Sequence, residues 1–317
     1  MNARIGGMTL VEMLVCMGLA LVLVLLAISL LLSSRATFTA QDEGGRLTES
    51  GQYALAMIER AVRQAGLENW DADGRALVQT PGMAPAILGL DDARLPDMPA
   101  ALQSAVAVGV NGSDVLAVRY FGSGASDGDG DGRTLNCTGV AVPEPGAGNL
   151  DDGRGWSIFH VARSATSEPE LRCKTRARNG SNWNSEAIAS GVESMQVLYG
   201  VDVTGDGLPE RFVRAGELGS AGGKTGAAAS PGPWNNVVAV RVALLVRGAQ
   251  QQPDASGEQV FDLFGSAYSK QYGATDHGVQ FREADLAMAE RKRARRLFAL
   301  SIPLRSRAGY MPNGLGS

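Results

Sequence analysis

Histidine and cysteine are scarce in this sequence, which has two histidines and three cysteines among 317 residues. Zinc enzymes and iron–sulfur proteins take most of their ligands from these residue types, so neither class is expected. An excess of positive charge is also missing, because 29 Lys and Arg stand against 33 Asp and Glu, for a net charge of −4. Nucleic-acid binding is therefore not expected. His160 and His277 have no partner pattern and H-E-x-x-H is absent, so no catalytic residue is predicted and the protein is not expected to be an enzyme.

Charge is almost absent from one N-terminal segment. Residues 8–32 contain a single charged residue, Glu12, and residues 13–32 contain none. An uncharged apolar run of about 20 residues can cross a bilayer as a helix. A cleaved secretory signal is the competing interpretation, but its apolar region spans only about 7 to 15 residues and ends at a small-residue cleavage site. This run is longer and continues into SSRATFTAQ, so residues 8–32 are predicted to be a retained transmembrane segment.

The residues at the start of this segment resemble a known processing signal. Residues 4–15 read RIGGMTLVEMLV, with a short basic leader that ends at Gly7, a hydrophobic Met8, and Glu12 at the fifth position after the glycine. This arrangement resembles the signal of type IV prepilins. The resemblance implies that a membrane aspartyl peptidase cuts after Gly7, removes the leader 1–7 and methylates the new amino terminus at Met8. It also implies that the apolar segment is kept as part of a filament core.

Two roles are open for Glu12. A carboxylate in an apolar helix costs a few kcal/mol in the bilayer unless it finds a partner. One interpretation is an interfacial glutamate near the helix start, where the positive end of the helix dipole stabilises it. The prepilin resemblance implies the other, in which Glu12 pairs with the free ammonium group of Met8 on a neighbouring subunit. Neutralising that charge pair would draw a subunit out of the lipid and into a filament.

The helix is expected to continue beyond the membrane segment. From Leu47 onward, small and apolar residues recur every three or four positions, which is the spacing of one helix face. Gly66 stands where a helix C-terminus favours glycine, so a helix from Thr9 to Ala65 is predicted within a helical region 8–66. Its apolar face comprises Gly51, Ala54, Leu55, Ile58, Ala61, Val62 and Ala65. Three glycines are expected to bend or loosen it, namely Gly18, Gly44 and Gly45.

Residues 67–317 have the composition of a β-rich head. Runs rich in Val, Ile, Leu, Tyr and Phe, bounded by Gly, Asn, Asp or Pro, predict strands. The runs are Ala105–Val110, Asp114–Phe121, Trp156–Val161, Val192–Val201, Val237–Arg247 and Leu297–Leu304. The near-continuous apolar run VVAVRVALLVR predicts a central strand, and glycine-rich stretches at 122–132, 139–155 and 215–232 predict loops. The predicted fold class is α+β, with a long N-terminal helix packed on a β-rich head, which is also the fold of type IV pilins.

Segments of the head extend the resemblance to one family of minor pilins. Residues 191–202, GVESMQVLYGVD, with the following GDGLPERFV and VVAVRVALLVRG, resemble the PilW family, and so does RLFALSIPLRSR at 296–307. The resemblance implies a low-abundance subunit that joins other minor pilins in a complex that primes pilus assembly and lies at or near the pilus tip.

The same resemblance implies partners and a location. The partners would be other minor pilins, the major pilin, the prepilin peptidase, the inner-membrane assembly platform and a tip adhesin. The chain would cross the bacterial inner membrane once, with a periplasmic head, and would enter an extracellular pilus after assembly. Pseudopilin J of type II secretion shares the leader, the helix and the β-rich head and is the principal alternative. A bitopic membrane protein with a periplasmic binding head is a further alternative, and such a protein would retain residues 1–7.

Two acidic, glycine-rich segments are candidate calcium sites. Each places oxygen ligands at alternate positions and glycine at the sixth, as in the first half of an EF-hand loop. The candidate ligands are Asp127, Asp129 and Asp131 in the first segment and Asp202, Thr204 and Asp206 in the second. The bidentate glutamate expected at position twelve is replaced by Thr138 and Val213, although Glu210 is an extra candidate ligand. Solvated turns are the alternative interpretation, because Asp and Gly both favour them.

The cysteines divide by location. Cys16 lies in the apolar helix and is expected to behave as a small hydrophobe. Cys137 and Cys173 both fall in the head, which the pilin resemblance places in an oxidising periplasm, so a disulfide is predicted between them. Two unpaired buried cysteines are the alternative.

One basic run remains, RKRARR at residues 291–296. The favoured interpretation is a solvated helix end balanced by Glu283, Asp285 and Glu290. The alternative is a contact with DNA, anionic lipid or an acidic face of another pilin.

Overall fold

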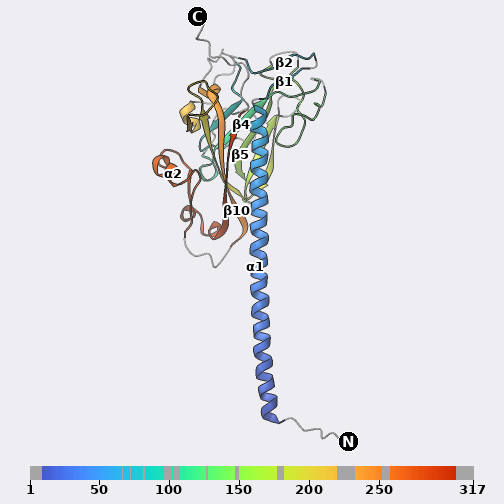
Figure 1. Ribbon diagram of the computed structural model, residues 1–317, viewed down its shortest axis with the longest axis vertical. Helices are drawn as coiled ribbons and strands as arrows, with labels where there is room; N and C mark the ends of the chain where they lie inside the picture. The colour runs from blue at the N-terminus through green and yellow to red at the C-terminus, as the bar shows by residue number, and fades with distance from the viewer. Residues whose placement is uncertain are drawn as a thin grey trace. The chain divides into compact units, whose positions relative to one another are not determined.

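A computed structural model gives the fold, and it divides the chain into two compact units, Met1–Arg46 and Leu47–Ser317. The structure describes residues 9–65, 67–71, 73–80, 83–95, 102, 108–125, 128–146, 150–176, 182–219, 233–251 and 258–304. The first unit is helical where it is described, and the second contains the last turns of the same helix together with the strands (Figure 1).

The helix α1 (Leu10–Ala65) confirms the predicted long N-terminal helix. It continues through Gly18, Gly44 and Gly45 without leaving the helical conformation, and the predicted terminal glycine, Gly66, lies outside the described residues. The predicted apolar face is also confirmed, since Ala54, Ile58 and Val62 are fully buried. Gly51 lies on this face, and a side chain there would come within 2.3 Å of the Phe298 ring. Glycine therefore lets the helix approach the sheet closely at this point.

Within the described residues, the strands form two larger antiparallel sheets and two short two-stranded sheets. One sheet has the order β3-β4-β5-β6-β7, with β3 (Ile87–Leu90), β4 (Val115–Tyr120), β5 (Gly155–Arg163), β6 (Pro169–Arg176) and β7 (Trp183–Ser190). The other has the order β13-β10-β8-β9, with β8 (Val192–Val201), β9 (Arg211–Val213), β10 (Val237–Gln251) and β13 (Arg293–Pro303).

The remaining elements are short. The two-stranded sheets are the hairpin of β1 (Asn69–Trp70) with β2 (Ala76–Leu77), and the pair of β11 (Val260–Asp262) with β12 (Gln280–Arg282). The helices are α2 (Ser266–Tyr272) and the 3-10 turns η1 (Val110–Gly112), η2 (Ala215–Leu218), η3 (Pro233–Asn236), η4 (Glu283–Asp285) and η5 (Met288–Glu290).

Five of the six predicted strands are present. They correspond to β4, β5, β8, β10 and β13, and β10 has the predicted central position, between β13 and β8. The run Ala105–Val110 is the exception. Residues 105–107 lie outside the described residues, and Val110 begins the turn η1 instead of ending a strand.

The core of the second unit lies between the two larger sheets and the final turns of α1. Side chains of Ile58 and Val62 from the helix join Phe159 of β5 and Met195 of β8 in one hydrophobic cluster. The strands β8 and β10 are buried along most of their length, as expected for near-continuous apolar runs. The head is therefore held by burial on both faces of its central strands.

Candidate functional site

The start of α1 is where the sequence places the processing and assembly residues. Gly7 and Met8 lie outside the described residues. The backbone N–H and the hydroxyl of Thr9 both donate to Glu12 Oε2, at 2.9 and 3.0 Å. The Glu12 N–H donates to the Thr9 hydroxyl oxygen at 3.3 Å. Thr and Glu three residues apart thus form a capping box, which satisfies donors that the first helical turn leaves unpaired.

The capping box gives Glu12 a structural role that the sequence interpretation missed. The signal was readable, because Thr-x-x-Glu before an apolar helix is a helix-start pattern. Glu12 is exposed, and a carboxylate can accept more bonds than Thr9 supplies. Capping can be done by glutamate or glutamine, whereas pairing with an ammonium group needs the charge. The two roles can therefore be separated by substitution.

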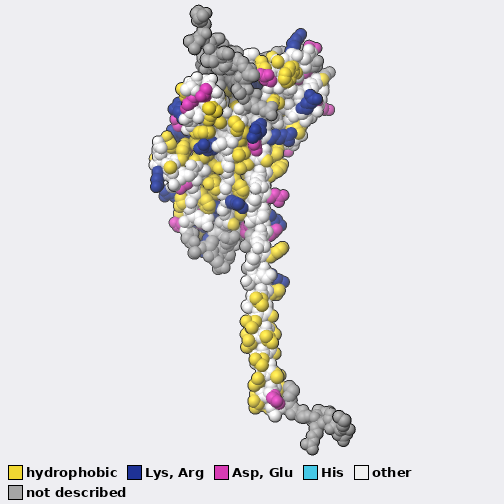
Figure 2. All heavy atoms as spheres, in the orientation of Figure 1, with side chains coloured by type: hydrophobic (Ala, Val, Ile, Leu, Met, Phe, Trp, Pro, Cys, Tyr) yellow, Lys and Arg dark blue, Asp and Glu magenta, His cyan; other side chains and the backbone are white. Residues whose placement is uncertain are grey.

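Apolar side chains cover the first part of α1 on every side. Between Leu10 and Leu32, exposed fractions of the large apolar side chains range from 48% at Ile28 to 76% at Leu10. Figure 2 shows these side chains along the N-terminal half of the helix. The helix contains an 18-residue window with a mean hydropathy of 3.0, none of which is buried. A helix that is apolar all round and unburied matches a membrane span in length and composition.

Three carboxylates come together in the loop between β8 and β9. Oxygens of Asp202, Asp206 and Glu210 lie within 4.8 Å of one another. The N–H groups of Gly205 and Gly207 donate to Asp202 at 2.5 and 2.8 Å. The sequence indicated Glu210 as an extra candidate ligand. In the structure its carboxylate lies close to those of the two aspartates.

Thr204, the other candidate ligand of this segment, contacts Glu210. Its hydroxyl donates to Glu210 Oε1 at 2.5 Å, and the Val203 N–H donates to Glu210 Oε2 at 2.7 Å. The Thr204 hydroxyl and then the Val203 N–H lower the pKa of Glu210, so this carboxyl group is ionised at neutral pH. Thr204 thus orients a carboxylate of the cluster, and its oxygen remains a candidate ligand.

The first acidic segment is arranged differently. Asp127 lies outside the described residues. Asp131 accepts a bond from the Ser123 hydroxyl and another from the Arg133 N–H at 2.9 Å. The Ser123 hydroxyl is the main reason that the pKa of Asp131 is lowered. Among the described residues, Asp129 and Asp131 belong to no cluster of three His, Cys, Asp or Glu side chains.

Cys137 and Cys173 are joined by a disulfide, which ties the loop before β5 to strand β6. Their Cα atoms are 6.3 Å apart and their sequence separation is 36. Both are buried. Closing a loop of this length stabilises a fold by roughly 3 to 4 kcal/mol in the chain-entropy model. Cys16 is a free, exposed cysteine on α1.

The interpretation of the basic run as a solvated helix end is wrong. Strand β13 begins at Arg293, within the run, and the Arg295 side chain is 0% exposed. The Arg295 Nε donates to Glu193 Oε2 at 2.6 Å, and its Nη1 donates to Glu283 Oε1 at 2.8 Å. Arg291 donates to the backbone oxygens of Leu286 and Ala284. Internal contacts therefore hold this part of the run.

Glu193 is the centre of a buried ionic network. Arg247 of β10 lies directly opposite Arg295 of β13 in the strand register. Like charges in that position repel. The Glu193 carboxylate contacts both, with Arg247 Nη1 at 3.2 Å. Arg247 also reaches Glu168 at 2.8 Å. The network links β8, β10, β13 and η4 in a region where Glu193 is only 1% exposed.

A second group of acids lies in the head, and one of them, Asp114, contacts strand β8. Asp114 is 3% exposed and accepts bonds from the N–H groups of Val197 and Asp92 at 2.8 and 3.0 Å. Burial raises the pKa of Asp114 well above its usual range, and the nearby Asp91 carboxylate raises it further. Burial also raises the pKa values of Asp91 and Asp276.

These shifts predict a pH dependence of stability. A raised pKa means that the folded head binds the proton more tightly than the unfolded chain. The stability that Asp114 contributes is then fully present below its ordinary pKa and is lost as the pH rises through the folded value. We expect the free energy of unfolding, relative to that of Asp114→Asn, to rise as the pH falls from about 8 to about 5. Denaturant unfolding at each pH measures this, and a constant difference across the range would contradict it.

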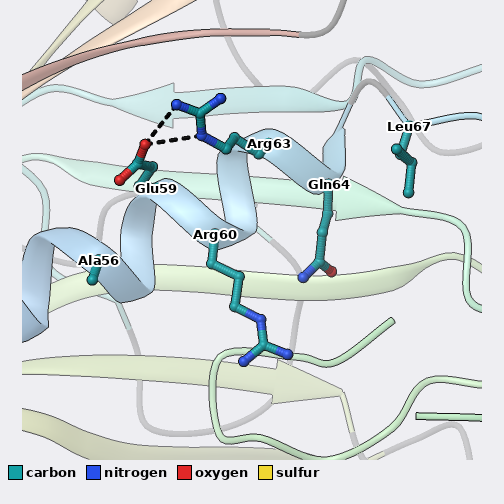
Figure 3. A pocket seen from close by; sticks show the side chains of 6 residues that line it. All are labelled: Ala56, Glu59, Arg60, Arg63, Gln64 and Leu67. Carbon is teal, nitrogen blue, oxygen red and sulfur yellow. Dashed lines mark hydrogen bonds and ion pairs between the residues drawn. The ribbon is translucent and has the colours of Figure 1, made fainter. Parts of the chain in front are cut away.

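A shallow hollow follows the outer face of α1. It is lined by Ala56, Glu59, Arg60 and Arg63, with Gln64 and Leu67 beyond them. Figure 3 shows the Arg63 guanidinium turned onto Glu59, with Nη2 to Oε1 at 2.7 Å. An exposed pair of this kind, one helical turn apart, contributes only about 0.3 to 0.5 kcal/mol.

Comparison with known proteins gives one finding. Residues 158–306 match the family model of the type IV pilus-assembly protein W. The matched region begins within β5 and extends just past the end of β13. No curated protein and no solved structure matched at a significant level.

Proposed function

We propose, from the premise that this chain is a PilW-like type IV pilus protein, that it acts as a minor pilin. The observation that carries the proposal is the position of Glu12, in the first turn of an unburied apolar helix and five residues after Gly7. Helix capping alone does not require a charge, because glutamine also caps a helix and a charge weakens membrane insertion.

The proposed role follows from that position. Cleavage after Gly7 would free the ammonium group of Met8, next to Thr9 and the capped start of α1. In the membrane, Glu12 of one subunit would pair with the ammonium group of another, and the apolar part of α1 would enter a filament core. The head would then meet other minor pilins in a complex that primes assembly at or near the tip. The family match favours a pilus over the secretion pseudopilus, whose J subunit shares the same leader and helix.

Processing tests this proposal directly. We expect the mature chain to begin at N-methylated Met8, because Gly7 and Glu12 stand at the two positions that the prepilin signal requires. Intact-mass spectrometry of protein extracted from membranes measures the mature N-terminus. A Gly7→Leu variant, in which the cleavage position is blocked, is the control and should keep residues 1–7. If the protein with its natural sequence also keeps residues 1–7, the minor-pilin role is ruled out.

We further propose that the loop 202–210 binds calcium weakly. The support is the approach of Glu210 to Asp202 and Asp206, with oxygens within 4.8 Å of one another. Carboxylate oxygens are the ligands that calcium prefers. Without the bidentate glutamate of a full EF-hand, the expected dissociation constant lies in the extracellular range of about 10⁻⁴ to 10⁻³ M.

Calcium should therefore raise the melting temperature of the head. A ligand that binds only the folded state stabilises it by mass action, so millimolar calcium should raise the Tm of a soluble protein that lacks residues 1–35. Asp206→Ala should reduce the rise, and any remainder would report on the segment that contains Asp129 and Asp131. The measurement is a thermal melt after chelation and after readdition of calcium. If calcium does not change the Tm of the unsubstituted head, both segments are solvated turns and not calcium sites.

A further inference from the structure

Trp70 is a large apolar side chain that the head leaves in solvent. It is 57% exposed, whereas Trp156 and Trp234 are 8% and 5% exposed, and Trp183 is half-buried. Its cross-strand partner on β2, Ala76, is also exposed, whereas Leu77, the partner of Asn69, is 4% exposed. An indole of this size ordinarily contributes more by burial than any other side chain. Trp70 therefore lies on the outward face of a short hairpin, where its indole takes no part in the packing of the head.

Trp70 lies at a hollow between the β1–β2 hairpin and two loops. We call this the Trp70 hollow. It has a volume of about 310 Å³ and is lined by Asn69, Trp70, Asp71, Asp131, Arg133 and Glu144, among others. A volume near 300 Å³ is at the lower end of small-molecule sites, which fits a ligand of one ring.

The walls of the Trp70 hollow are fixed by hydrogen bonds. The Asn69 side-chain amide donates to the backbone oxygens of Gly122 and Phe121, at 2.7 and 3.3 Å, and so ties the hairpin to the loop. The Glu144 N–H donates to the Gly124 oxygen at 3.3 Å. Gly124 has φ +87°, and a side chain there would lie 2.7 Å from the Asp131 nitrogen. The loops can approach this closely only with glycine, so the hollow is formed before any ligand arrives.

We propose that the Trp70 hollow binds a single saccharide ring. One face of a pyranose ring is made of C–H groups, which pack on an indole, and its rim carries hydroxyl groups that both donate and accept hydrogen bonds. The hollow is lined by Trp70, whose indole is exposed, by the acidic residues Asp131 and Glu144, and by Arg133, whose side chain is 88% exposed and approaches Asp131 at 3.6 Å. An apolar surface with a few convergent polar groups is the usual form of a small-molecule site.

This inference does not depend on the pilus role, because it concerns binding by the head itself. The carboxylates outnumber Arg133, so a basic side chain of a protein partner is the competing occupant. A cation can also sit over an indole face. The exposed indole together with both acceptors and donors favours a sugar, since a basic side chain would gain nothing from Arg133.

The test uses the full chain in a detergent without a sugar headgroup, such as lauryldimethylamine oxide. Trp70 is the most exposed of the four tryptophans, so acrylamide quenching of fluorescence reports mainly on its access to solvent. Millimolar lactose, maltose, cellobiose and chitobiose are the probes. At least one of these sugars should lower the acrylamide quenching constant until it saturates, close to the value of the Trp70→Phe variant. An oligolysine peptide serves as the basic probe.

Saturation-transfer NMR on the same disaccharides then tests the residue. Trp70→Ala should abolish the transfer, because the stacking surface is gone. Tyr53→Ala is the matched control, since Tyr53 is an aromatic residue of similar exposure, 52%, on α1 and outside the hollow. It should leave the transfer unchanged. The proposal is overturned if no probe sugar shields Trp70, if transfer survives Trp70→Ala, or if oligolysine shields Trp70 and no sugar does.

Discussion

Replacing Glu193 by glutamine should lower the free energy of unfolding of the head by about 3 to 5 kcal/mol. The Glu193 carboxylate lies between Arg247 and Arg295, which face each other across β10 and β13. Glutamine keeps the shape of the side chain but removes the charge. The side chains of Arg247 and Arg295 are only 3% and 0% exposed. Their guanidinium groups then lose the carboxylate that lies between them. Arg247 keeps Glu168 and Arg295 keeps Glu283, but the buried carboxylate that balances the two facing guanidinium groups is lost, and removing one partner from a buried ionic network is strongly destabilising.

The matched control is the same change on an exposed strand. Glu186 lies on the edge strand β7 and is exposed, so Glu186→Gln should change the free energy of unfolding by less than about 0.5 kcal/mol. Both variants can be compared by denaturant unfolding followed through tryptophan fluorescence. An equal effect of the two substitutions would show that the network does not stabilise the head.

The same network shows a limit of prediction from local sequence patterns. The run at 291–296 suggested a solvated helix end because local charges near it, Glu283 and Glu290, could balance it. Glu283 is indeed a partner of Arg295, but the main partner, Glu193, is 102 residues away in the sequence. Burial of Arg295 depends on the register of β13 against β10, and no local pattern encodes that register.

Strand prediction succeeded and failed for a common reason. Strands β8 and β10 were predictable because both are buried along most of their length and therefore read as apolar runs. Strands β6 and β7, PELRCKTR and WNSEAIAS, were missed because they are polar. They are strands because they pair with β5 and with each other. Tertiary pairing overrides local propensity at such positions.

At the start of α1, the candidate site was more accessible to sequence reasoning. Position, spacing and residue type of Glu12 follow from consecutive residues, so the helix start and the apolar span could both be predicted. The carboxylate cluster at 202–210 was predicted in part, because Glu210 lies close to the two aspartates in sequence. The sequence did not predict that the Thr204 hydroxyl donates to Glu210. That contact depends on the conformation of the loop between β8 and β9.

Replacing Glu12 by glutamine should reduce the amount of this protein in filaments about tenfold or more, while leaving membrane insertion and cleavage intact. A hydrogen bond to a charged group contributes roughly 1.5 to 3 kcal/mol, about twice a neutral one. Loss of that difference in the membrane is enough for a tenfold change in an equilibrium. The measurement is the ratio of this protein in sheared filaments to that in membranes, by immunoblot.

The capping box makes this substitution selective. Glutamine three residues after Thr9 can still accept the bonds from the Thr9 N–H and hydroxyl, which Glu12 accepts at 2.9 and 3.0 Å. Glu12→Gln therefore removes the charge and keeps the cap, whereas Thr9→Ala removes the cap's side chain and keeps the charge. If Glu12 acts by pairing with an ammonium group, Glu12→Gln should lower incorporation far more than Thr9→Ala. The reverse order would assign Glu12 to helix capping alone, and equal incorporation of both variants at the unmodified level would exclude any role for Glu12 in assembly.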